Sequence, residues 1–76
     1  MIISLVAYAE LKEYLGQDGK LSLEVSPGTR LGEVALALGI PKDRVMNIVC
    51  DQTLETWDSF VKDGCVYQIL PLICGG

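Results

Sequence analysis

The sequence predicts an α+β domain, in which a mixed sheet of four to five strands is covered on one face by one main helix. Several short segments are apolar or alternate between apolar and polar residues, as strands do. A segment in the middle of the chain instead has apolar residues at helical spacing. A length of 76 residues, half of them hydrophobic, suits a single small domain with its own core.

The first part of the chain predicts two strands joined by a short helix. Residues 2–8 are apolar on both faces, which is typical of a central strand. Residues 9–15 have helical composition, and Gly16 ends this helix. Residues 20–25 alternate, with Leu21, Leu23 and Val25 expected to face the core.

The main helix is predicted over residues 30–38, with Thr29 as its N-cap. Its apolar residues recur every three or four positions and form a single core-facing stripe: Leu31, Val34, Ala35 and Leu38. Gly39 terminates this helix, and Pro41 prevents its continuation.

The second half predicts three strands: residues 45–50, a short edge strand at 53–57, and residues 65–70. Asp63 and Gly64 are expected to form a turn and nothing more, and Pro71 ends the last strand. If the first and last strands lie side by side in the centre of the sheet, they are parallel. That arrangement is the β-grasp, or ubiquitin-like, roll. We expect it over residues 1–71, followed by a flexible C-terminal tail at 72–76.

Composition argues against several classes of function. The net charge of −4 and the scattered basic residues do not suit nucleic-acid binding. The apolar N-terminal segment is too short to cross a membrane, so we expect a cytoplasmic protein. The chain contains no histidine, so a self-contained active site is not expected.

The three cysteines form neither a disulfide framework nor a metal-binding pattern in the sequence, and no metal site is predicted. Cys50 and Cys65 are expected to be small core or strand residues, which neighbouring strands could bring near each other. Cys74 is expected to contact a groove on a partner, although its thiol is close enough to the C-terminus to intercept acyl chemistry.

The chain ends in Gly75 and Gly76, which add almost nothing to the stability of a folded domain. Two glycines before a free carboxylate can instead enter a channel too narrow for any side chain. From Pro71 to Gly76 the chain spans roughly 20 Å when fully extended. The tail is therefore the part of the chain best suited to chemistry inside another protein.

Residues 50–54, 61–64 and 70–76, together with the opening at 7–11, resemble the MoaD/ThiS sulfur-carrier family. Pro71 and the helix after the first strand favour the branch that forms the small subunit of molybdopterin synthase. The Asp-Gly turn, the following strand and the terminal Gly-Gly are weak signals singly but fairly specific in combination.

The resemblance implies that the Gly76 carboxylate is adenylated with ATP by a ubiquitin-activating-type adenylyltransferase. A sulfur donor protein then converts it to a thiocarboxylate, which a large catalytic synthase subunit uses in molybdopterin biosynthesis. The chain would be the sulfur-donating small subunit of that sulfurtransferase complex, with no permanently bound cofactor. Gly75 and Cys74 would form the tail passage. The residues expected to contact partners are Ile69, Pro71, Leu72 and Ile73.

Three other functions fit the same tail or fold. The chain could carry sulfur in the thiamin pathway, or be a ubiquitin-like modifier that is conjugated to target proteins through Gly76. It could also be an interaction module without carboxyl chemistry. Its activity would then survive deletion of the terminal glycines.

Overall fold

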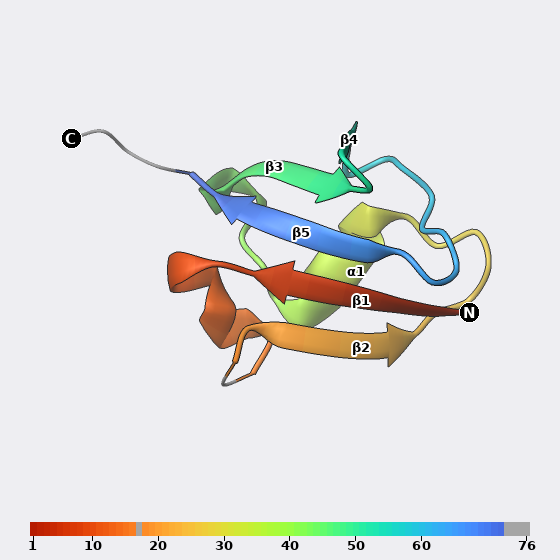
Figure 1. Ribbon diagram of the computed structural model, residues 1–76, viewed down its shortest axis with the longest axis horizontal. Helices are drawn as coiled ribbons and strands as arrows, with labels where there is room; N and C mark the ends of the chain where they lie inside the picture. Colours follow the sequence, from red (N-terminus) through yellow and green to blue (C-terminus); the bar gives the residue numbers. More distant parts are fainter. Residues whose placement is uncertain (17, 73–76) are drawn as a thin grey trace.

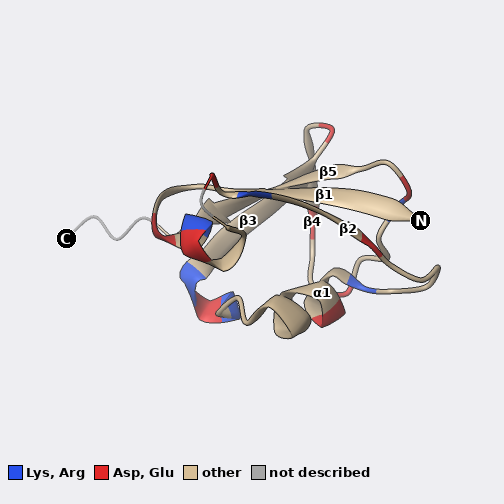
Figure 2. Ribbon diagram, turned by 90° about the horizontal axis from the view of Figure 1, so that it is seen from below, with Lys and Arg blue, Asp and Glu red and all other residues tan. Residues whose placement is uncertain are grey.

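The computed structural model describes residues 1–16 and 18–72, which form one sheet with a helix packed across one face (Figure 1). Figure 2 shows the α-helix on one side of the sheet and the opposite face left uncovered by it. The strands are β1 (Ile2–Ala7), β2 (Lys20–Glu24), β3 (Val45–Cys50), β4 (Thr53–Glu55) and β5 (Val66–Pro71). The helices are η1 (Ala9–Tyr14) and η2 (Lys42–Arg44), both 3₁₀, and the α-helix α1 (Leu31–Leu38).

The strands lie in the order β2-β1-β5-β3-β4. β1 and β5 are parallel neighbours, whereas β1 with β2, β3 with β4, and β3 with β5 are antiparallel pairs. The predicted α+β architecture and the parallel central pair are therefore confirmed. The last strand of the chain lies inside the sheet, with a hydrogen-bonded neighbour on each side.

The core fills the space between the sheet and α1. Alternate residues of β1 and β5 point into it, so that Leu5 and Tyr67, which are register partners, are both almost completely buried. α1 contributes the predicted stripe, in which Leu31, Val34 and Ala35 are buried and Leu38 packs at the margin. The alternate side chains of the strands therefore pack against the apolar stripe of α1 and form one apolar layer.

The short helix after the first strand is confirmed, whereas the predicted N-cap of α1 is wrong. Residues 9–14 form a 3₁₀ helix, whose first residue, Ala9, has a positive φ of 54°. A segment this short forms too few i→i−4 bonds to favour the α-helix. Thr29 does not cap α1, because its hydroxyl donates to the carbonyl of Ser26 at 2.7 Å. The N-cap is Arg30, whose backbone N–H donates to the carboxylate of Glu33 at 3.2 Å.

The Asp63–Gly64 turn does more than reverse the chain. The Asp63 carboxylate accepts a hydrogen bond from the Ile2 N–H at 2.9 Å, and the Gly64 N–H donates to the Ile2 carbonyl at 2.7 Å. The turn therefore fixes the start of β1 beside the start of β5, and the two parallel strands begin in register.

Among the described residues, no helix is both long enough and apolar enough to span a bilayer.

We predict that Tyr67→Phe destabilises the fold by about 1 kcal/mol, because it leaves a partly buried donor unpaired. The Tyr67 hydroxyl, on a fully buried side chain, accepts a hydrogen bond from the Lys62 N–H at 3.0 Å. Tyr8→Phe, at a tyrosine that is 39% exposed, is the matched control and should change the free energy of unfolding by less than about 0.5 kcal/mol. Urea denaturation measures both variants, and equal losses would contradict the role assigned to the hydroxyl.

Candidate functional site

The candidate site lies at the C-terminal end of β5, where the predicted tail begins. β5 pairs with β1 as far as Ile69, opposite Ala7, and with β3 as far as Pro71, opposite Val45. The strand runs toward the end of the sheet that is opposite the N-terminus (Figure 1). The chain therefore leaves the sheet from an interior strand that is held on both sides.

The backbone is still attached to the sheet one residue after Pro71. The Leu72 N–H donates to the carbonyl of Arg44 at 2.8 Å, at the point where η2 meets β3. The guanidinium of Arg44 in turn pairs with the Glu10 carboxylate on η1 at 3.0 Å. Both side chains are more than half exposed, so this ion pair adds at most about 1 kcal/mol to stability. It links η1 and η2 beside Leu72.

A cavity of about 450 Å³ opens at this junction and is lined by Glu10, Asp43, Arg44 and Leu72. The Leu72 side chain is 45% exposed and Pro71 is half-buried, so both are accessible to a partner. The prediction that Ile69 contacts a partner is wrong, because its side chain is 3% exposed and belongs to the core. The period of two along β5 gives Ile69 the same orientation as the buried Tyr67. Ile73, Cys74, Gly75 and Gly76 lie outside the described residues.

The uncovered face of the sheet offers contacts that the sequence analysis missed. Val66, Gln68 and Leu70 alternate with the buried Tyr67 and Ile69, so they face away from α1. This row of side chains leads along β5 toward Leu72. Of residues 66–70 only Gln68 is polar, so the sequence did not show which set of side chains faces the helix. The order of the strands in the sheet decides it.

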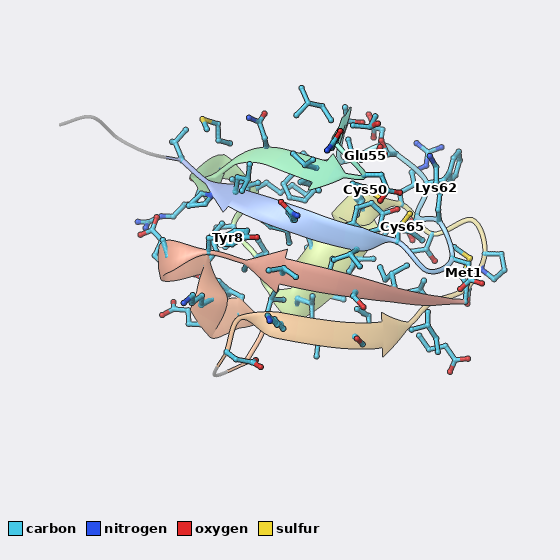
Figure 3. All side chains as sticks on the ribbon, viewed as in Figure 1. Met1, Tyr8, Cys50, Glu55, Lys62 and Cys65 are labelled. Atoms are coloured by element: carbon cyan, nitrogen blue, oxygen red, sulfur yellow. The ribbon has the colours of Figure 1, made fainter. Side chains whose placement is uncertain are left out.

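The structure also brings together Cys50 at the end of β3, Asp51 in the β3–β4 turn and Cys65 just before β5. The two sulfur atoms and a carboxylate oxygen lie within 4.8 Å of one another. Figure 3 shows both cysteines near the start of β5, whereas Tyr8 lies toward the end where β5 finishes. The expectation that neighbouring strands could place Cys50 near Cys65 is confirmed.

The surroundings keep the Cys50 thiol protonated. Burial, followed by the proximity of Cys65 and the negative charges of Asp51 and Glu55, raises the pKa of Cys50 from 9.0 to about 12. Burial is also the main cause that raises the pKa of Tyr67 from 10.0 to about 12. Because the thiolate is the nucleophilic form of cysteine, Cys50 is unreactive at neutral pH and is a poor candidate for a sulfur-transfer residue.

Three solved structures resemble the whole domain. SAMP1 from Haloferax volcanii superposes with a TM-score of 0.73 at 16% identity, covering 100% of both chains. A putative molybdopterin converting factor subunit 1 from Pyrococcus furiosus gives a TM-score of 0.74 at 18% identity, covering 96% of this chain and 99% of that one. The fold is the ubiquitin-like β-grasp.

A third β-grasp neighbour comes from a complex of subunits 1 and 2 of the molybdopterin-converting factor of Helicobacter pylori. It has a TM-score of 0.63 and 20% identity, with 100% of both chains covered. Neither a protein-family model nor a curated protein matches the sequence. The structural similarity, with TM-scores of 0.63 to 0.74, confirms the β-grasp fold predicted from the strand order.

The raised pKa values predict a loss of stability in alkali. In the unfolded chain, Cys50 and Tyr67 lose their protons near their ordinary pKa values of 9.0 and 10.0. Between about pH 9 and pH 12 the unfolded chain therefore binds fewer protons than the folded chain. Stability from these groups is complete below about pH 9 and falls as the pH rises toward 12.

Urea denaturation of the reduced protein at several pH values tests this. In Tyr67→Phe the decline above about pH 10 should be shallower than in the wild type, since one of the two groups is gone. The control Tyr8→Phe should follow the wild-type profile. Parallel profiles for Tyr67→Phe and the wild type would show that the Tyr67 proton is not held by the fold.

Proposed function

We propose that this protein is a sulfur carrier whose Gly76 carboxylate is adenylated and then converted to a thiocarboxylate for molybdopterin biosynthesis. The observation that carries the proposal is the attachment of Leu72 to Arg44 at the end of an interior strand, with Gly75 and Gly76 still to follow in the sequence. The likeness to two structures named as molybdopterin converting factor subunit 1, or as a complex containing it, supports the choice of pathway.

The fixed position of Leu72 defines the reach of the reacting end. Four residues follow Leu72, so the terminal carboxylate lies at most about 14 Å from the sheet when they are extended. A partner that binds the domain therefore receives the carboxylate within a small, defined volume. Such positioning replaces a random encounter by a nearly intramolecular reaction, which can lower a barrier by several kcal/mol.

The chemistry follows from the weakness of a carboxylate as an electrophile. Attack of the Gly76 carboxylate on the α-phosphate of ATP releases pyrophosphate and forms an acyl-adenylate with AMP as a good leaving group. A cysteine persulfide of a donor protein then displaces AMP and forms an acyl disulfide with Gly76. A second thiol of the donor attacks the donor's sulfur in that bond, so the thiocarboxylate is released on Gly76 and a disulfide remains on the donor. Since the sulfur carries negative charge at neutral pH, it can attack an electrophilic precursor of the dithiolene in a partner's active site.

The described surface suggests how partners bind. Val66, Gln68 and Leu70 lie on the uncovered face of β5, in line with the exposed Leu72. The overall charge of −4 favours partners with a basic binding surface. By analogy with the Helicobacter pylori complex of subunits 1 and 2, one partner would be a large synthase subunit. The other would be an adenylyltransferase, because the proposed chemistry requires activation of the Gly76 carboxylate.

The proposal predicts a defined change in intact mass. Incubation with ATP, a sulfur donor and the matching adenylyltransferase should increase the mass by the exchange of one oxygen for one sulfur. Fragmentation should locate the change at Gly76. Deletion of Gly75 and Gly76 should abolish it, while urea denaturation shows an unchanged fold, because glycine has no side chain that could contribute packing to stability.

Cys74→Ser is the matched control, because a persulfide on Cys74 would add a whole sulfur atom without loss of oxygen. The exchange should persist in this variant. Unchanged mass with an adenylyltransferase shown to be active on its own carrier would contradict the proposal. High-mass conjugates in denaturing gels would instead identify a protein modifier, and activation of a thiazole synthase rather than a molybdopterin synthase would identify the thiamin pathway.

A further inference from the structure

The cluster of Cys50, Asp51 and Cys65 is not used by the proposed sulfur-carrier chemistry. It lies at the start of β5, whereas the tail leaves from the other end of the same strand. β5 is six residues long, which separates the two ends by roughly 20 Å. Any function of the cluster is therefore independent of whether the tail carries sulfur.

We propose that Cys50, Asp51 and Cys65 bind one zinc ion through two thiolate sulfurs and one carboxylate oxygen, with water as the fourth ligand. This assignment rests on the three ligand atoms, which come from residues far apart in the sequence and lie within 4.8 Å of one another. The sequence alone predicted no metal site, because the widely spaced cysteines, with Cys50 and Cys65 15 positions apart, do not match a zinc-binding pattern.

The geometry is close to that of a tetrahedral site. Zn–S bonds of about 2.3 Å and Zn–O bonds of about 2.0–2.2 Å place neighbouring ligands roughly 3.5–3.8 Å apart. The separations of at most 4.8 Å exceed this by no more than about 1.3 Å. Since Asp51 is exposed and Cys65 is half-buried, side-chain rotations can close that gap without moving the strands.

The local backbone explains why a carboxylate meets two sulfurs here. Asp51 and Gln52 form the tight turn between β3 and β4, with positive φ values of 51° and 66°. This turn places Asp51 directly beside the end of β3, where Cys50 is buried. The Cys65 N–H donates to the Lys62 carbonyl at 3.1 Å, which fixes the loop that carries the second thiol.

The donor set selects the class of metal. Two sulfur ligands favour zinc and similar thiophilic ions over Mg²⁺ and Ca²⁺, which prefer oxygen ligands. Asp51 is a ligand and Glu55 lies close enough to interact with Cys50, so the site is negatively charged before the cation arrives. On binding, each thiol releases its proton to solvent and the sulfur donates to the metal.

A disulfide between Cys50 and Cys65 is the competing use of the same pair. It requires an S–S distance of about 2.05 Å and an oxidant, and it gives no role to the nearby carboxylate. A zinc ion accommodates the wider spacing and uses all three residues. We therefore assign the cluster to a metal and treat disulfide formation as an outcome of the test.

The experiment titrates the reduced Cys74→Ser protein with Zn²⁺ in competition with a chromophoric chelator, and with Co²⁺ as a spectroscopic probe. The Cys74→Ser background removes the third thiol of the chain. We expect one tight site and, with Co²⁺, the intense visible bands of tetrahedral sulfur ligation. Adding Cys65→Ser should weaken zinc binding by more than about tenfold. Loss of a direct ligand costs more affinity than loss of a group that only hydrogen-bonds to a ligand.

Asp51→Asn is the second variant, because asparagine tolerates the positive φ at this position and the turn should remain intact. It should weaken zinc binding, whereas Asp43→Asn, at an exposed carboxylate in η2, should not. If Cys65→Ser fails to fold by circular dichroism, Asp51→Asn decides the question.

Three results would overturn the assignment. The first is unchanged zinc binding in Cys65→Ser or Asp51→Asn. The second is binding in the wild type that disappears when Cys74 alone is replaced. The third is a protein that forms the Cys50–Cys65 disulfide under mild oxidant and, when reduced, binds no zinc.

Discussion

The double pairing of β5, with β1 on one side and β3 on the other, is the constraint on which the rest of the structure depends. It buries Tyr67 and Ile69 in the centre of the core and turns Val66, Gln68 and Leu70 outward. A slip of one residue in either ladder would exchange these two sets of side chains. The same register fixes the position at which β5 ends. One set of hydrogen bonds therefore positions both the core and the start of the segment whose Gly76 carboxylate is proposed to react.

The two ends of β5 have different chemical surroundings. At its start, buried sulfur and nearby carboxylates form a cluster whose Cys50 thiol stays protonated without a metal. At its end, the Leu72 amide is held by Arg44 beside an exposed ion pair and an open cavity. The first arrangement provides sulfur and oxygen donors for the proposed zinc ion, whereas the second presents the exposed Leu72 to a partner. A rigid strand between them allows both to exist without interfering.

Much of the architecture could be predicted because its causes are local. Apolar or alternating segments indicated the strands, helical spacing indicated the stripe on α1, and Gly39, with φ of 74°, ended that helix. The N-cap was missed because Thr29 had a nearer partner in Ser26. The burial of Ile69, the bond from Leu72 to Arg44, and the meeting of Cys50 with Cys65 all depend on register between distant strands. A single sequence carries little information about that register.

In the proposed mechanism, Leu72, anchored at the end of β5, sets how far the Gly76 carboxylate reaches into a partner. The most direct test compares the rate of adenylate formation for the full chain and for a chain that lacks Ile73 but keeps Gly75 and Gly76. The account predicts an unchanged fold and adenylation at least about tenfold slower, because one residue shortens the reach by roughly 3.4 Å. Equal rates for the two chains would contradict it.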